Sequence, residues 1–183
     1  MKLQPIHRAR RFFASLLPYR SDPAEDQWVN KWLSASEQKL FSRVQGQDRR
    51  HAIGVARAVE DHENDQSTGE LHPPTPRWVV AAALLHDIGK TVPDLGTYGR
   101  VVATMSAWVG GVDMAEHWAD TTGFTRKVGL YMMYPRLGSD LLAVAGSDQK
   151  VVDWAAQHHL DEEDWTIPVE SGRLLQAADD GVL

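Results

Sequence analysis

A run of apolar residues that ends in a histidine and an aspartate constrains this chain most. Arg77 to Lys90 reads RWVVAAALLHDIGK, and every residue from Trp78 to Leu85 is apolar. Because this apolar surface is wider than one stripe, it predicts a helix that is buried on most of its sides. Gly89 is expected to end the segment. His86 and Asp87 should therefore lie deep inside the protein.

The pair His86 and Asp87 has two interpretations. A buried carboxylate is costly unless a positive group pairs with it. Imidazole and carboxylate are ordinary ligands of divalent first-row metals, so a bound ion would offset the cost of burying Asp87. The alternative is a helix C-terminus at which His86 satisfies backbone carbonyls and Asp87 turns the chain. The dipeptide alone leaves both interpretations open.

Composition limits the fold and the chemistry. With 183 residues, 43% of them apolar, the chain is long enough for one sizeable core, and we expect a single domain over residues 23–183. There is no cysteine, which excludes thiolate metal sites and fits a cytoplasmic location, so any metal must use His, Asp, Glu or water. The net charge of −6 gives no general attraction for nucleic acid.

Residues 1–22 are expected to form a basic tail. The apolar part of this segment, Phe12–Leu17, is too short for a secretory signal. Three interpretations remain open: a frayed or loosely docked tail, a weak contact with anionic membrane or nucleic acid, and a helix packed on the domain. Five basic residues and no acidic residue stand in the first twenty: Lys2, Arg8, Arg10, Arg11 and Arg20.

Helical spacing recurs along the chain, and no stretch alternates convincingly with period two. Ser34 followed by Glu37 predicts a capping box, and the polar segment Glu63–Pro76, which holds three prolines, predicts a loop. The sequence therefore predicts an all-α fold, a compact bundle of eight or nine helices. The other stretches with helical spacing are Ala24–Leu33, Leu40–Gln45, His51–His62, Tyr98–Val109, Met114–Asp120, Thr125–Tyr134, Leu137–Ala145, Asp148–Leu160 and Val169–Asp180.

Residues of metal-ligating type stand at the ends of several expected helices. His51 opens one helix, His86 and Asp87 end the buried one, and Asp179 follows an apolar run near the C-terminus. Separated helices can converge in space where neighbours in sequence cannot. These positions therefore form a candidate metal site.

This order of residues resembles the HD superfamily of metal-dependent phosphohydrolases. The matching pieces are RRHAIGVARAV, AALLHDIGK and LLQAADD, with a histidine pair at 158 and 159, and together they cover roughly residues 48–180. LLHDIGK is fairly specific because the apolar lead-in, the HD pair and the trailing GK occur together. GTYGRVVAT and AGSDQKVVDWAAQHHLDEEDW also resemble a group of small actinobacterial HD-domain proteins, which brings no assigned substrate.

The resemblance implies an all-helical metal-binding core that hydrolyses phosphate esters of nucleotides or related small molecules. It implies that His51, His86, Asp87 and Asp179 bind one divalent ion, with Asp180 as the alternative to Asp179. Such a ligand set leaves positions for water and a substrate oxygen, and the ion would activate that water and neutralise phosphoryl charge. The choice among Mn, Fe, Co, Ni, Mg and Zn stays open.

Further roles follow from the same resemblance. Lys90 would contact substrate phosphate and act with Asp87 in catalysis; the alternative is a surface lysine. His158 and His159 resemble the additional histidines of binuclear members, so they are candidates for a second ion or for substrate contacts. They are otherwise histidines favoured by a helix C-terminus. Tyr134 stands where such members usually have another histidine, and because tyrosine is a poor ligand this departure favours one ion.

Three functions are compatible with these features. The leading hypothesis is a metal-dependent phosphohydrolase that acts on a small phosphorylated substrate, without a clear nucleic-acid or membrane partner. The alternative is a non-catalytic HD-like sensor that binds metal and a phosphorylated signal. A third and weaker hypothesis is a scaffold that uses the basic N-terminus at a membrane surface or on RNA.

Overall fold

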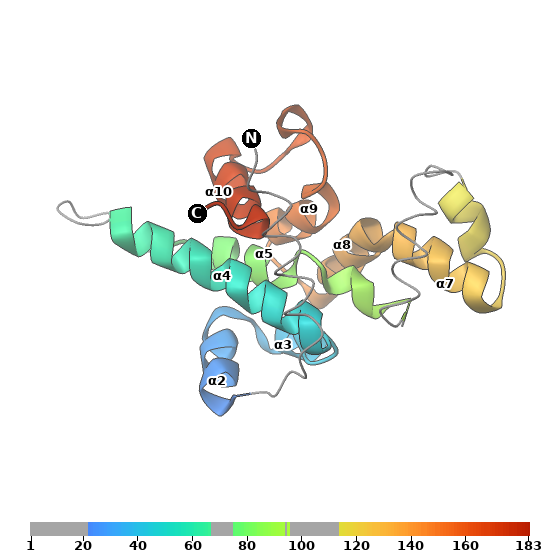
Figure 1. Ribbon diagram of the computed structural model, residues 1–183, viewed down its shortest axis with the longest axis horizontal. Coiled ribbons are helices and arrows are strands. Elements are labelled where there is room, and N and C mark those ends of the chain that lie inside the picture. The colour runs from blue at the N-terminus through green and yellow to red at the C-terminus, as the bar shows by residue number, and fades with distance from the viewer. Residues whose placement is uncertain (1–21, 67–74, 94, 96–113) are drawn as a thin grey trace.

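The computed structural model describes residues 22–66, 75–93, 95 and 114–183. Within these ranges every regular element is a helix and none is a strand, which confirms the all-α prediction (Figure 1). The elements with defined bounds are α2 (Pro23–Trp32), α3 (Ala35–Phe41), α4 (Gly46–Gln66), α5 (Arg77–Leu85), the 3₁₀ helix η1 (Ile88–Thr91), α7 (Gly123–Met132), α8 (Tyr134–Ala145), α9 (Gln149–Gln157), the 3₁₀ helix η2 (Glu162–Asp164) and α10 (Val169–Asp180).

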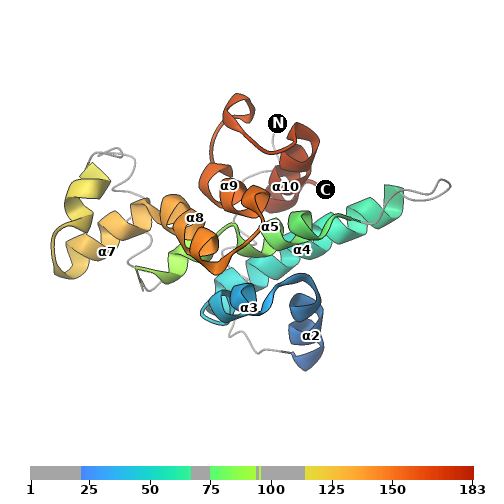
Figure 2. The same ribbon diagram turned by 180° about the vertical axis from the view of Figure 1, so that it is seen from behind.

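Helix α5 is the centre of the bundle, as its apolar sequence predicts. Every residue from Val79 to Leu85 is buried. The helix packs against α4, α9, α10 and α2, and in both views α9 and α10 lie on one side of it with α2 and α3 on the other (Figure 1, Figure 2). Because apolar neighbours surround it, α5 holds the residues at its C-terminal end at the middle of the domain.

Several helix boundaries differ from those predicted, and each difference matters for the site. Helix α5 ends at Leu85, and the chain continues as a turn and then as η1. Helix α4 begins at Gly46, because the carbonyl of Gln45 accepts the first helical hydrogen bonds, so His51 lies in the second turn. Helix α9 is capped by Asp148 and ends at Gln157.

Tyr134 opens a helix where the sequence suggested the end of one. Helix α7 ends at Met132, and α8 starts at Tyr134 with Pro135 in its first turn. A proline at this position costs no hydrogen bond, because the first backbone N–H groups of a helix have no intrahelical partner. Pro135 thus lies within the first turn of α8 and not in the connection before it.

The predictions for residues 1–21 and for a helix at Tyr98–Val109 lie outside the described residues. None of the helices in the described ranges is both long enough and apolar enough to cross a lipid bilayer.

The predicted capping box at the start of α3 is confirmed. The Glu37 carboxylate accepts a hydrogen bond from Ser34 N at 2.6 Å, and Glu37 N donates to Ser34 Oγ at 3.3 Å. The same buried carboxylate pairs with the Arg77 guanidinium at 2.9 Å, which ties α3 to the first turn of α5. Burial acts to raise the pKa of Glu37, but the hydrogen bonds from Ser34 and the charge of Arg77 outweigh it and lower that pKa.

We expect Glu37→Gln to lower the free energy of unfolding by roughly 1–3 kcal/mol at pH 7, because it removes the charge from buried, hydrogen-bonded contacts. A lowered folded-state pKa stabilises the fold above the unfolded value near 4.5, and this stabilisation is lost as the pH falls through the folded-state pKa. The difference in unfolding free energy between variant and wild type should therefore become smaller in acid. Urea unfolding at several pH values measures this difference, and Glu163→Gln, at an exposed glutamate, is the control.

Gly89 lets η1 approach α8 closely. A Cβ added at Gly89 would lie 1.9 Å from the carbonyl oxygen of Tyr134 and 2.7 Å from the amide nitrogen of Gly138. These are backbone atoms of α8, so they cannot move aside without shifting the helix. The glycine expected only to end a helix therefore fixes η1 against the first turns of α8.

Gly89→Ala should destabilise the protein by roughly 1–3 kcal/mol, because the added methyl group overlaps backbone atoms. Gly54→Ala is the matched control: nothing lies within 4 Å of its added Cβ, and it is in the middle of α4. That change should stabilise the protein by about 0.5–1 kcal/mol. Thermal and urea unfolding of both variants would measure this, and equal effects would refute the close-packing explanation.

Candidate metal centre

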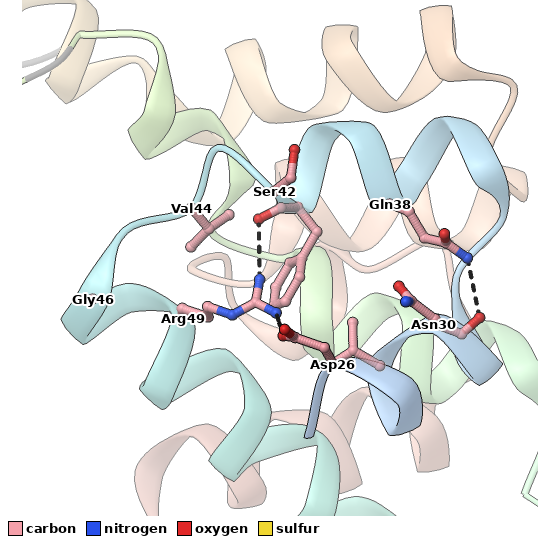
Figure 3. A pocket seen from close by; sticks show the side chains of 9 residues that line it. Asp26, Asn30, Gln38, Ser42, Val44, Gly46 and Arg49 are labelled. Carbon is pink, nitrogen blue, oxygen red and sulfur yellow. Dashed lines mark hydrogen bonds and ion pairs between the residues drawn. The ribbon is translucent and has the colours of Figure 1, made fainter. Parts of the chain in front are cut away.

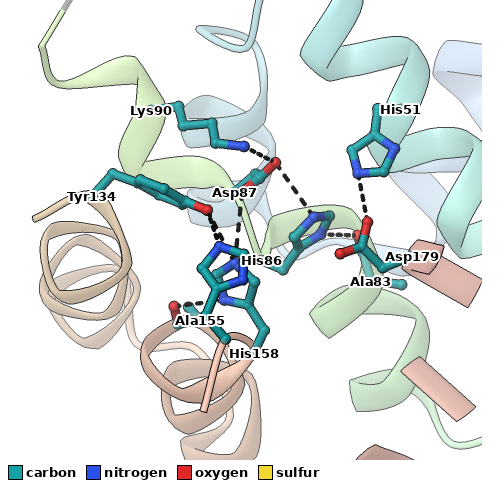
Figure 4. Close-up of polar contacts among 10 residues, drawn as sticks. His51, Ala83, His86, Asp87, Lys90, Tyr134, Ala155, His158 and Asp179 are labelled. Carbon is teal, nitrogen blue, oxygen red and sulfur yellow. Dashed lines mark hydrogen bonds and ion pairs between the residues drawn. The ribbon is translucent and has the colours of Figure 1, made fainter. Parts of the chain in front are cut away.

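Three separate parts of the chain bring the predicted ligands together (Figure 4). His51 comes from α4, His86 and Asp87 follow α5, and Asp179 is in the last turn of α10. One ligand atom from each of His51, His86 and Asp87 lies within 4.8 Å of the others. His51 Nε2 is 2.8 Å from Asp179 Oδ1, so the fourth predicted ligand adjoins this group.

The spacing of these atoms fits ligands of one ion. With bonds of roughly 2.1 Å, neighbouring ligand atoms are about 3.0 Å apart around an octahedral ion and about 3.4 Å apart around a tetrahedral one. The distance from His51 Nε2 to Asp179 Oδ1 is 2.8 Å, and that from His86 Nε2 to Asp87 Oδ2 is 3.4 Å. Both distances are close to the separation of adjacent ligands.

The tautomer of His86 also fits metal binding. His86 Nδ1 lies 2.9 Å from the carbonyl oxygen of Ala83, and because a carbonyl only accepts, Nδ1 must carry the proton. A neutral His86 then directs the Nε2 lone pair toward the Asp87 carboxylate, and these two electron-rich atoms repel each other unless a cation lies with them. A metal ion or a proton on Nε2 meets this requirement, as in other centres where a carbonyl orients a metal-binding histidine.

Asp87 is ionised despite its burial. Its side chain is 8% exposed, and Lys90 Nζ lies 2.5 Å from Oδ2. Burial acts to raise the pKa of Asp87, but the positive charge of Lys90 and the contact with His86 hold that pKa well below its usual range. For His86, burial acts to lower the pKa, and the adjacent carboxylate of Asp87 outweighs it and raises that pKa.

Lys90 is not a free surface lysine. Its side chain is 18% exposed, and the ammonium group lies 4.7 Å from the centre of the Tyr134 ring in addition to its contact with Asp87. Burial acts to lower the pKa of Lys90, but the carboxylate of Asp87 more than compensates and raises it. The lysine therefore carries its charge inside the site.

Asp179 and His51 form the more open side of the centre. Their side chains are 30% and 24% exposed, whereas His86 is 3% exposed. Burial acts to raise the pKa of Asp179, but the hydrogen bond with His51 lowers it strongly. Asp179 has this contact with His51, while the alternative ligand, Asp180, is exposed. Water or substrate can reach an ion from this side.

His158 and His159 adjoin the centre through Tyr134. His158 caps α9, with Nδ1 3.1 Å from the Ala155 carbonyl and Nε2 3.7 Å from Asp87 Oδ1. The Tyr134 hydroxyl forms a hydrogen bond with His159 Nε2 and lies 3.4 Å from His158 Nε2. Burial raises the pKa of Tyr134 well above its usual value, so the phenol keeps its proton. Burial lowers the pKa of His159 to about 4, so this imidazole is neutral and can accept that proton's hydrogen bond.

The HD domain family model matches residues 49–180. The chain belongs to the HD domain family. No curated protein and no solved structure matches it. HD domains typically bind divalent metals, and the group His51, His86 and Asp87 of this HD domain can hold one.

The contacts of Tyr134 were not predicted. In the sequence this residue stands out only as a position that lacks a histidine, whereas its hydroxyl links both histidines that follow α9. Pro135 is the local signal for a helix that starts here. Nothing in the spacing of residues 134, 158 and 159 indicates that their side chains meet.

A separate cavity of about 400 Å³ lies between α2, α3 and the start of α4 (Figure 3). Arg49 is in its wall, where the guanidinium is 2.5 Å from Asp26 Oδ1 and 4.6 Å from the centre of the Phe41 ring. Arg49 is near His51 in sequence, yet these contacts place its charge at this cavity. None of the histidines of the metal centre lines it.

We expect Mn²⁺ to stabilise this HD domain and His86→Ala to remove that effect. An ion present at 100 times its dissociation constant adds about 2.7 kcal/mol, and in a domain of this size that raises the melting temperature by roughly 5–10 °C. Thermal unfolding with Mn²⁺ and with a chelator would measure the shift. His117→Ala, at an exposed histidine, is the matched control. An undiminished shift in His86→Ala would contradict this metal site.

Proposed function

We propose that this HD domain is a metal-dependent phosphohydrolase that cleaves a phosphate ester of a nucleotide-like or other small phosphorylated substrate. The observation that carries the proposal is the convergence of His51, His86, Asp87 and Asp179 beside the ammonium group of Lys90. Family membership supports it, since HD domains are generally hydrolases.

The four predicted ligands have one shared task in the proposed reaction, which is to hold the ion. His51, His86, Asp87 and Asp179 would hold one divalent ion, which when bound supplies an activated water and positive charge for the phosphoryl oxygens. Asp87, which Lys90 keeps ionised, is more buried than Asp179, the other carboxylate of the group. His86 Nδ1 keeps its proton and donates it in a hydrogen bond to the Ala83 carbonyl, so Nε2 remains available as a ligand.

Lys90 is suited to bind the substrate phosphate. Its ammonium group has three N–H donors, of which one points at Asp87 Oδ2, so others remain for a phosphoryl oxygen. The contacts with Asp87 and with the Tyr134 ring hold the charge in place before substrate arrives. A positive group that needs no rearrangement stabilises developing negative charge more effectively than a mobile one.

The charge of the chain supports a small substrate. With a net charge of −6, the protein has no general attraction for a long polyanion, and binding to nucleic acid depends largely on such attraction. The positive charge needed for a single phosphate group can come from one ion and Lys90 alone.

The test is a panel of phosphate esters assayed with Mn, Co, Ni, Fe, Mg and Zn. We expect turnover that Asp87→Ala abolishes and that Lys90→Ala reduces in kcat by roughly 10²–10³-fold, the usual effect of removing one charge-stabilising donor. Lys39→Ala, at an exposed lysine in α3, is the matched control. Tight binding of metal and nucleotide with no turnover across the panel would contradict the hydrolase and support the sensor alternative.

A further inference from the structure

The Asp87 carboxylate has two sides, and only one belongs to the metal centre described above. Oδ2 faces His86 at 3.4 Å and Lys90 at 2.5 Å. Oδ1 lies 3.7 Å from His158 Nε2, and the centres of the His158 and His159 rings are 4.0 Å apart. Two imidazoles and a carboxylate oxygen thus lie on the second side, a donor set that in itself suits a second cation.

The Tyr134 hydroxyl lies among these donors. His158 Nδ1 is engaged with the Ala155 carbonyl, so Nε2 is the nitrogen that could bind an ion, and Nε2 lies 3.4 Å from the hydroxyl. His159 Nε2 is hydrogen-bonded to the same hydroxyl. The two nitrogens that would bind a second ion therefore both adjoin a protonated phenol, which is a poor ligand for most divalent ions.

The backbone keeps Tyr134 in this position. Its carbonyl oxygen would be 1.9 Å from a Cβ at Gly89, so the first turn of α8 is in close contact with η1. Because η1 also carries Lys90, the tyrosine and the lysine are fixed relative to each other. The ring of Tyr134 then lies 4.7 Å from the Lys90 ammonium.

The positive charge of Lys90 also disfavours a second ion. Its ammonium lies 2.5 Å from Oδ2, so the ammonium and the first ion together already give the Asp87 carboxylate two positive partners, in a site where this side chain is 8% exposed. Charges of like sign repel strongly where little water screens them. The same ammonium already supplies one positive charge beside Asp87.

We propose that Tyr134 and Lys90 keep this centre mononuclear: the hydroxyl takes the space between His158 and His159, and the ammonium replaces the charge of a second ion. This inference rests on the proposed function in that it assumes one ion at His51, His86, Asp87 and Asp179. In this inference Tyr134 and Lys90 together determine how many ions bind.

The test is the Mn²⁺ stoichiometry of the full chain, measured by equilibrium dialysis with elemental analysis and by electron paramagnetic resonance. Wild type should hold one equivalent and give the spectrum of an isolated ion. Tyr134→His combined with Lys90→Met should hold two equivalents and give the spectrum of a coupled pair, because it adds a ligand and removes the competing charge. Lys90→Met alone, which leaves the Tyr134 hydroxyl in place and adds no ligand, should stay at one equivalent.

The outcomes separate this inference from the proposed function. Two coupled ions in wild type would overturn the inference even if the protein hydrolyses phosphate esters, and this result needs no variant to fold. A folded Tyr134→His, Lys90→Met variant that stays at one equivalent would overturn it as well. One ion in wild type, two in that variant, and no turnover with any ester would support the inference and refute the hydrolase.

Discussion

The buried carboxylate of Asp87 is the feature on which the candidate metal centre depends. Helix α5 enters the core because nearly its whole surface is apolar, and it carries Asp87 to a place where the residue is 7% exposed. A negative charge at such a place is unfavourable without positive partners. Lys90 supplies a positive charge at one carboxylate oxygen, and His86 and His158 lie near the two oxygens, so the fold surrounds Asp87 from three separate positions.

His86 and His158 are oriented by the same kind of hydrogen bond. His86 follows α5 and His158 follows α9, and in each the Nδ1 atom contacts the carbonyl oxygen three residues earlier, at Ala83 and Ala155. The last carbonyls of a helix lack intrahelical partners, so the imidazoles satisfy groups that would otherwise be unpaired. Both histidines consequently direct Nε2 toward Asp87. The interpretation as helix-end histidines and the interpretation as site residues are therefore compatible.

Much of the site could be predicted because its signals are local. The apolar run before His86 predicts burial, and the order of the family's residues singles out His51 and Asp179. The contacts of Tyr134 could not be predicted in this way, because they depend on how α8 packs on η1 and on α9. Helix boundaries were wrong where one residue has two possible roles: Pro135 can end a helix or begin one, and the sequence favoured the first.

The residues after Asp87 show why the local geometry matters. The α-helix ends at Leu85, a turn follows, and a 3₁₀ helix begins at Ile88 with Asp87 as its N-cap. In a 3₁₀ helix, side chains three residues apart lie one above the other. Lys90 therefore stacks over Asp87, and its amide also donates to the Asp87 carbonyl at 3.0 Å. Gly89, between them, has no Cβ to prevent α8 from bringing Tyr134 against the lysine. The glycine thus determines where the charge of the neighbouring lysine lies.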